Sequence, residues 1–121
     1  MNGWARAPGS RMGHRIPSLD ALPQLAPALR ALADPTRLLL LAILQDGERT
    51  VTELVVRTGL AQANVSKHLQ QLHAQGFVTR RKAGLFVHYG LADRQLLRLM
   101  GQLQSRLADG TASVAEPPRA R

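Results

Sequence analysis

The 121-residue sequence predicts a mainly α-helical domain with one small β-hairpin. Five segments carry apolar residues at helical spacing between recognisable start and stop signals. Two runs rich in β-forming residues flank Ala83-Gly84, which is typical of a hairpin. Two of the helical segments are short and are separated by little more than Gly59, so we expect a tight turn between them.

The first two helices are defined mainly by leucine and proline. Leucines recur at helical spacing in the first helix, and Pro23 and Pro27 limit its regular part to about residues 24–33. The second helix begins at Asp34-Pro35, a good N-cap followed by the preferred first-turn proline. Gly47 then marks its end, and its Leu-rich composition indicates a largely buried helix.

The third and fourth helices form a helix-turn-helix. Thr50 and Glu53 have the spacing of a capping box, and the third helix is expected to run to Thr58. After a turn at Gly59, the fourth helix is expected to end at Gly76. A narrow apolar stripe along this fourth helix consists of Val65, Leu69 and Leu72.

The hairpin and a fifth helix complete the domain. Residues 77–82 and 85–91 are the expected strands, and one apolar face of the hairpin is expected from Leu85, Val87, Tyr89 and Leu91. Asp93 caps the last helix. Its apolar stripe consists of Leu96, Leu99, Met100, Leu103 and Leu107. A hairpin placed directly after a helix-turn-helix makes a winged helix-turn-helix.

One folded domain is expected at residues 18–109. Residues 1–17 form a basic segment rich in Gly, Pro and Arg, and residues 110–121 have a similar composition, so both are predicted to be flexible tails. The longest apolar run, Leu38 to Leu44, is too short to cross a bilayer, and the N-terminus lacks the apolar core of a secretion signal. We therefore expect a soluble cytoplasmic protein.

Charge is separated along the chain. Sixteen Lys and Arg against eight Asp and Glu give a formal charge of +8, which favours a polyanionic partner. No acidic residue lies between Glu53 and Asp93, whereas residues 18–60 carry four positive and five negative charges, a sum of −1. The basic character of the domain therefore lies mainly in the fourth helix and the hairpin.

The fourth helix has a polar side suited to the major groove of DNA. At about 100° per residue, Ala63, Lys67 and Gln70 lie opposite its apolar stripe. Asn and Gln pair with adenine edges, and an alanine methyl can contact the thymine methyl. A merely solvated, glutamine-rich face is the alternative. The predicted DNA-binding residues are Gln62, Ala63, Asn64, Ser66, Lys67, His68, Gln70 and Gln71 on the helix, with Arg80, Arg81 and Lys82 on the wing.

These segments resemble the ArsR/SmtB family of winged-helix repressors over about residues 25–109. The most specific parts are Ala33 to Arg37, the Val65 to Leu69 core of the fourth helix, and a glycine-turned wing ending in Tyr89. One departure is Ala61, where the family usually has a serine that caps the fourth helix.

The resemblance implies a homodimer, formed by the first and last helices, that binds an inverted-repeat operator and blocks transcription until a signal arrives. The apolar stripe of the last helix needs a cover, and a partner's copy is a natural one. Burial against the first two helices of the same chain is the alternative. The predicted interface consists of Leu25, Leu29, Leu96, Leu99, Met100, Leu103 and Leu107.

The metal sites common in similar proteins are not expected. The chain has no cysteine, and Val55 and Arg57 occupy the two thiolate positions of the third-helix motif. In the last helix, the ligand positions that follow Asp93 hold Gln95, Arg106 and Asp109. The histidines, His14, His68, His73 and His88, leave open only a site across the dimer or one completed by the N-terminal segment.

No arrangement of nucleophile, base and acid favours catalysis. Ser66 and His68 are two residues apart on a helix and point in different directions, and no glycine-rich phosphate loop is present. We therefore expect a protein without enzymatic activity or cofactor. Two alternatives stay open: a winged helix that binds another protein, and a nickel- or zinc-responsive repressor that uses histidine and carboxylate ligands.

Overall fold

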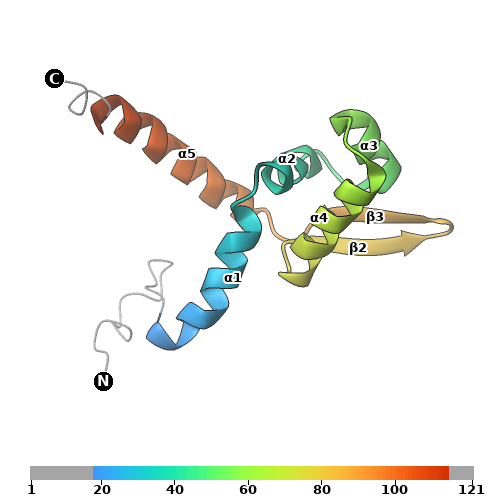
Figure 1. Ribbon diagram of the computed structural model, residues 1–121, viewed down its shortest axis with the longest axis horizontal. Coiled ribbons are helices and arrows are strands. Elements are labelled where there is room, and N and C mark those ends of the chain that lie inside the picture. Colours follow the sequence, from blue (N-terminus) through green and yellow to red (C-terminus); the bar gives the residue numbers. More distant parts are fainter. Residues whose placement is uncertain (1–17, 115–121) are drawn as a thin grey trace.

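The computed structural model describes residues 18–114, and it contains five α-helices and a three-stranded sheet (Figure 1). Residues 1–17 and 115–121, which belong to the two predicted tails, lie outside the described residues. The elements in order are η3 (Leu19–Ala21), α1 (Leu22–Leu32), α2 (Pro35–Leu44), β1 (Arg49–Thr50), α3 (Val51–Thr58), α4 (Gln62–Ala74), β2 (Val78–Ala83), β3 (Phe86–Leu91) and α5 (Gln95–Val114).

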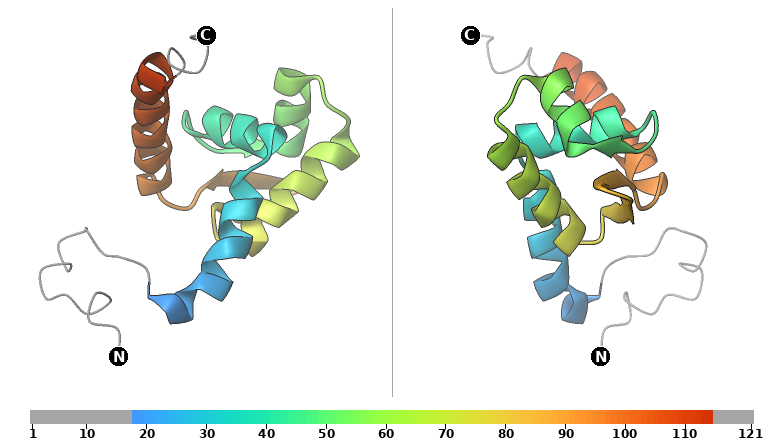
Figure 2. Two further views of the ribbon diagram at one scale, coloured as in Figure 1. Left: turned by 60° about the vertical axis from the view of Figure 1, so that its left-hand side comes forward. Right: turned by 90° about the vertical axis from the view of Figure 1, so that its right-hand side faces the viewer.

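Helices α2, α3 and α4 pack on the sheet and enclose the core (Figures 1 and 2). The β2–β3 hairpin extends to one side of this centre, and α5 extends to the opposite side (Figure 1). The core therefore depends on residues from nearly every central element. Its buried members are Leu40, Leu41, Ile43, Leu44, Leu54, Val65, Leu69, Leu72, Val78 and Tyr89.

Helix α1 begins two residues earlier than its prolines predicted. Pro23 lies in the first turn, where its missing N–H would have had no helical partner, so it does not delay the helix. Pro27 lies inside the helix, where it costs one backbone hydrogen bond without ending it. A short 3-10 turn, Leu19–Ala21, leads into this helix.

The predicted N-cap of α2 is confirmed. The helix itself is buried on one side only. Asp34 is the N-cap, and its Oδ2 accepts a hydrogen bond of 3.0 Å from the backbone N–H of Arg37. Leu40 and Leu41 are fully buried, but Leu38 and Leu39 are exposed. The prediction of a largely buried helix thus holds only for the side that faces the core.

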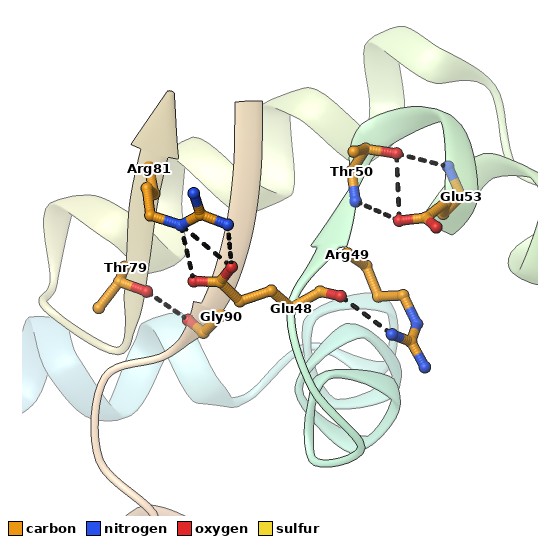
Figure 3. Close-up of polar contacts among 7 residues, drawn as sticks. All are labelled: Glu48, Arg49, Thr50, Glu53, Thr79, Arg81 and Gly90. Carbon is orange, nitrogen blue, oxygen red and sulfur yellow. Dashed lines mark hydrogen bonds and ion pairs between the residues drawn. The ribbon is translucent and has the colours of Figure 1, made fainter. Parts of the chain in front are cut away.

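The helix-turn-helix is confirmed in detail. Thr50 Oγ1 accepts from the backbone N–H of Glu53 at 3.2 Å, and Glu53 Oε1 accepts from that of Thr50 at 2.8 Å (Figure 3). This capping box starts α3. Gly59 ends α3 at φ +74°, a left-handed conformation that residues with a Cβ adopt with strain.

The sheet contains one strand more than predicted, and its tip differs from the prediction. The short strand β1 pairs with β3, so the antiparallel order is β1-β3-β2. Ala83 pairs with Phe86, which makes Gly84 and Leu85 the turn. Leu85 was expected on the apolar face, but it is 94% exposed because it lies in this turn.

Helix α5 is longer than predicted. Asp93 Oδ1 accepts a hydrogen bond of 2.7 Å from the backbone N–H of Gln95, as the predicted cap requires. The helix continues to Val114, so its last turn lies within the segment that was expected to be the C-terminal tail.

Candidate nucleic-acid interface

Helix α4 is held in place by its apolar stripe. The side chains of Val65, Leu69 and Leu72 are all 0% exposed. They pack into the core formed with α2, α3 and β2. Burial of each such side chain contributes about 1.5–3 kcal/mol to the stability of the fold, so these contacts hold α4 against the core.

The opposite side of α4 is exposed and free of carboxylates. Ser66 is half-buried at its margin. These side chains carry amide, hydroxyl, methyl and ammonium groups, and the helix contains neither Asp nor Glu. The exposed residues of the predicted DNA-binding set on this helix are Gln62, Ala63, Asn64, Lys67, Gln70 and Gln71.

His68 differs from the rest of the predicted set because it faces α2. Only 13% of its side chain is exposed, and its Nδ1 lies 3.8 Å from Asp34 Oδ2. The guanidinium of Arg37 approaches the same ring nitrogen at 3.4 Å. His68 therefore lies at the joint between α2 and α4 instead of on the outer side of α4.

Arg37 binds several groups at this joint. Its Nε donates to the backbone carbonyl of Ala31 at 2.5 Å, and its Nη2 donates to that of Arg30 at 3.3 Å. Its Nη1 donates to Gln71 Oε1. The backbone N–H of Arg37, and secondarily the charges of His68 and of Arg37 itself, lower the pKa of Asp34 below its ordinary value. Gln71 is thus exposed but engaged within the chain.

The wing divides its three cations between two faces. Strand alternation puts Arg80 and Lys82 on the face of β2 that also carries buried Val78, and puts Arg81 on the opposite face. Arg80 and Lys82 are exposed. The helices pack on the Val78 face, so these two cations lie on the same side of the sheet as α4.

Arg81 is paired with Glu48, which precedes β1 (Figure 3). Its Nη2 lies 2.6 Å from Glu48 Oε1, and its Nε donates to the same oxygen at 3.1 Å. Because of this hydrogen bond, the pKa of Glu48 is lowered and that of Arg81 is raised. Of the three wing cations, Arg81 is the one held by a carboxylate within the described chain.

The N-terminus of α4 lacks a side-chain cap. Ala61 occupies the N-cap position, and no side-chain hydrogen bond is made there. This agrees with the sequence, in which Ala61 departs from the capping serine usual in the family that it resembles. The first amides of α4 are consequently left for solvent or for a ligand.

The predicted dimer residues fall into two groups. Leu96 and Met100 pack against the core of their own chain, which corresponds to the alternative of burial within one chain. The remaining leucines of the α5 stripe are more than half exposed, and Leu29 on α1 is equally exposed. Leu25 is half-buried. The exposed residues are Leu29 (53%), Leu99 (56%), Leu103 (54%) and Leu107 (58%).

A groove of about 590 Å³ runs between α2 and α5. Leu38 and Leu39 line one wall, and Leu103 and Leu107 line the other. The apolar surface of α5 is therefore continuous with exposed apolar surface on α2.

Two absences hold within residues 18–114. No group of three or more histidines and carboxylates that could hold a metal ion occurs there. No helix in that range is long and apolar enough to cross a membrane.

Two of the polar contacts have no local signal in the sequence. Arg37 and Gln71 are 34 positions apart, and Glu48 and Arg81 are 33 apart. Both pairs join elements that meet only in the folded chain. Helical periodicity predicts which face of α4 is polar, but it does not predict which polar side chains form hydrogen bonds within the chain.

Known proteins of similar sequence are transcriptional regulators. The model of the family "Bacterial regulatory protein, arsR family" matches residues 34–80. Nodulation protein NolR of Rhizobium meliloti is 36% identical over 93 residues, which cover 77% of this chain and 76% of NolR. The "Probable mercury resistance operon repressor" of Streptomyces lividans is 40% identical over 85 residues, which cover 70% and 68%.

A solved structure has the same architecture. It is the homodimeric winged helix-turn-helix DNA-binding domain of Mb0332 from Mycobacterium bovis, with a TM-score of 0.67 and 34% identity. The match covers 75% of this chain and 83% of that domain. With its helix-turn-helix, wing and exposed carboxylate-free α4, the chain belongs to the ArsR family of DNA-binding transcriptional regulators.

Proposed function

We propose that the chain is a dimeric, sequence-specific repressor that reads the major groove of its operator with α4. One observation carries the proposal: three fully buried side chains anchor α4, and its outer side presents only groups that suit DNA. A carboxylate there would be repelled by phosphate.

The outer residues of α4 have complementary roles in this proposal. Asn64 and Gln70 are amides that can pair with the N6 and N7 edge of adenine, and Ser66 can bond several base edges. Ala63 can contact a thymine methyl. Lys67 supplies charge to a guanine edge or a phosphate. Gln62, at the start of α4, is placed to bond the backbone.

The remaining predicted residues act around this surface. Arg80 and Lys82 project from the sheet face on which the helices pack, so they are proposed to bind phosphates beside the groove. Arg81 contributes less, because Glu48 already holds its guanidinium. His68 and Gln71 are proposed to support α4 from within the chain, because both contact Arg37.

A second copy of the chain is proposed to cover the exposed leucines of α1 and α5. Leu29, Leu99, Leu103 and Leu107 are each more than half exposed, and the groove beside α2 extends this surface. The similar domain from Mycobacterium bovis is homodimeric. Two α4 helices related by a twofold axis would read an inverted repeat with half-sites about 34 Å apart.

Repression is proposed because a similar protein of Streptomyces lividans is named an operon repressor. A sensor built on thiolates is excluded because the chain has no cysteine. The inducing signal would therefore be of another chemical kind.

The test is a titration of the protein against a labelled duplex from the region upstream of its gene. If six phosphates are contacted per dimer, the affinity should fall about a thousandfold between 50 and 200 mM salt. Absent or salt-insensitive binding would refute the proposal. Capture of a stable protein partner that DNA does not displace would instead favour the protein-interaction alternative.

A further inference from the structure

We propose that Arg37 is a positioning residue that locks the recognition helix α4 to α1 and thereby sets the half-site spacing of the dimer. The inference rests on the proposed function, because it concerns how the two α4 helices are held apart. No part of it requires Arg37 to contact DNA.

On one side, the guanidinium of Arg37 is fixed to the end of α1. Its Nε and Nη2 donate to the carbonyls of Ala31 and Arg30 at 2.5 and 3.3 Å. Both carbonyls lie in the last turn of α1. The Arg30 carbonyl also accepts from the backbone N–H of Ala33 at 3.1 Å, whereas the regular partner of the Ala31 carbonyl would be Pro35, which has no N–H. Arg37 thus caps the C-terminus of α1 with a positive charge, which the helix dipole also favours.

On the other side, the same guanidinium holds α4. Its Nη1 donates to Gln71 Oε1 and lies 3.4 Å from His68 Nδ1. His68 is in turn 3.8 Å from the carboxylate of Asp34, the residue that caps α2. A planar guanidinium with several fixed donors can serve both helices at once, which a lysine ammonium cannot.

The apolar stripe of α4 does not define this geometry by itself. Burial of Val65, Leu69 and Leu72 resists removal of the helix from the core, but apolar contact is non-directional and tolerates small tilts. Hydrogen bonds from a rigid fork are directional. Arg37 therefore adds the constraint that fixes the direction of α4 relative to α1.

The constraint has a consequence for the dimer. Leu25 and Leu29 on α1 belong to the proposed interface, so the orientation of α1 is tied to the twofold axis. A tilt of α4 relative to α1 occurs in both copies of the dimer. The two displacements add, so the separation of the two α4 helices changes by twice the amount of one. Loss of the Arg37 contacts should accordingly relax the preference for one spacing.

The first experiment measures spacing directly. A duplex is selected from a random library with the wild-type protein, and versions with one base pair inserted or deleted between the half-sites are made. We expect Arg37→Lys and Gln71→Ala each to reduce the preference for the native spacing about tenfold, the effect of losing a hydrogen bond to a charged group. The double variant should lose no more than either single one. Gln75→Ala, at the exposed end of α4, is the matched control.

The outcomes separate the two roles open to Gln71. If Gln71→Ala alters the preferred base at one position and keeps the spacing preference, Gln71 reads a base and the inference is wrong. Unchanged spacing preference in both variants also overturns it. Should Arg37→Lys fail to fold by circular dichroism, Gln71→Ala decides the matter, because its side chain is exposed and its loss leaves the core intact.

A second experiment needs no DNA. The chain has no cysteine, so Gln24→Cys on α1 and Gln62→Cys on α4 provide two unique, exposed sites for spin labels. With excess unlabelled chain present, the label-to-label distance distribution should be narrow and should broaden with Arg37→Lys or Gln71→Ala. A distribution that stays narrow would contradict the lock. Broadening, together with a failure of the unlabelled wild-type protein to bind any duplex, would uphold the lock and reject the repressor function.

Discussion

Single side chains determine where the helices of this chain begin. Asp34 caps α2, Thr50 and Glu53 cap α3 reciprocally, and Asp93 caps α5. Alanine occupies the N-cap of the other two helices, Ala21 at α1 and Ala61 at α4, and a methyl group cannot accept a hydrogen bond from their first amides. The recognition helix is therefore the one central helix with an unsupported start.

A serine at this position should stabilise the domain. Ala61 has extended backbone, φ −64° and ψ 145°, as an N-cap residue requires. We expect Ala61→Ser to raise the free energy of unfolding by about 1 kcal/mol, because its hydroxyl would accept from a free amide. Chemical denaturation measures this change. Ala74→Ser, at the exposed C-terminal end of α4, should give no gain, and an equal gain from both variants would rule out capping as the cause.

Acid should destabilise the fold. The pKa values of Asp34 and Glu53 are lowered chiefly by backbone N–H groups, and that of Glu48 by the side chain of Arg81. A carboxyl group whose pKa is lowered by folding stabilises the folded state. This stabilisation is complete at a pH above the pKa of the unfolded state, and it is lost as the pH falls through the pKa of the folded state. The ordinary values are 3.8 for Asp34 and 4.5 for Glu48 and Glu53, so the loss should begin near pH 4.5.

Thermal melts between pH 3 and 7 measure this loss. The melting temperature should fall below about pH 4.5, and Glu53→Gln, which retains the capping geometry, should weaken the dependence. If Glu53→Gln melts at the same temperature as wild type at every pH, the charge of Glu53 does not contribute to the acid sensitivity of the fold.

At the scale of the elements, the two parts of the DNA-binding surface should behave differently. Arg80 is free of a carboxylate partner in the described chain, whereas Glu48 holds Arg81. We expect Arg80→Ala to weaken binding to all duplexes and to flatten the salt dependence by about two units of slope, because the dimer loses one phosphate contact per copy. Arg81→Ala should have a smaller effect. Binding measured at several salt concentrations would contradict this order if Arg81→Ala proved the more harmful change.

Most element boundaries could be predicted because their signals are local. The cap of α2, the capping box of α3 and the stripe of α4 each depend on residues within seven positions of one another. Strand β1 could not be predicted, because two residues gain strand geometry only by pairing with β3. Leu85 was misplaced because alternation alone does not tell a turn residue from a strand residue.

The candidate site was predictable as a face and not as a set of contacts. The outward position of Lys67 and Gln70 followed from helical periodicity and is confirmed by their exposure. The engagement of Gln71 by Arg37, and of Arg81 by Glu48, depends on how distant segments meet. Membership of a family of transcriptional regulators confirms that the chain is not an enzyme.

At the scale of the whole molecule, the exposed leucines of α5 require a cover. We expect the double variant Leu99→Asp with Leu103→Asp to be monomeric, because two carboxylates would be buried in the proposed interface. Its operator affinity should fall by at least about a hundredfold, since one α4 alone loses the second half-site. Val56→Asp, on an exposed part of α3, is the control and should leave both properties unchanged. Sedimentation would contradict the interface if the double variant remained dimeric.

Selection of duplexes from a random library tests whether the outer side of α4 reads base pairs. The Lys67→Ala/Gln70→Ala variant should select a sequence that differs from the wild-type sequence at positions within each half-site. The Arg80→Ala/Lys82→Ala variant should select the wild-type sequence with lower affinity. If wild type and both variants select one and the same sequence, α4 does not read the bases.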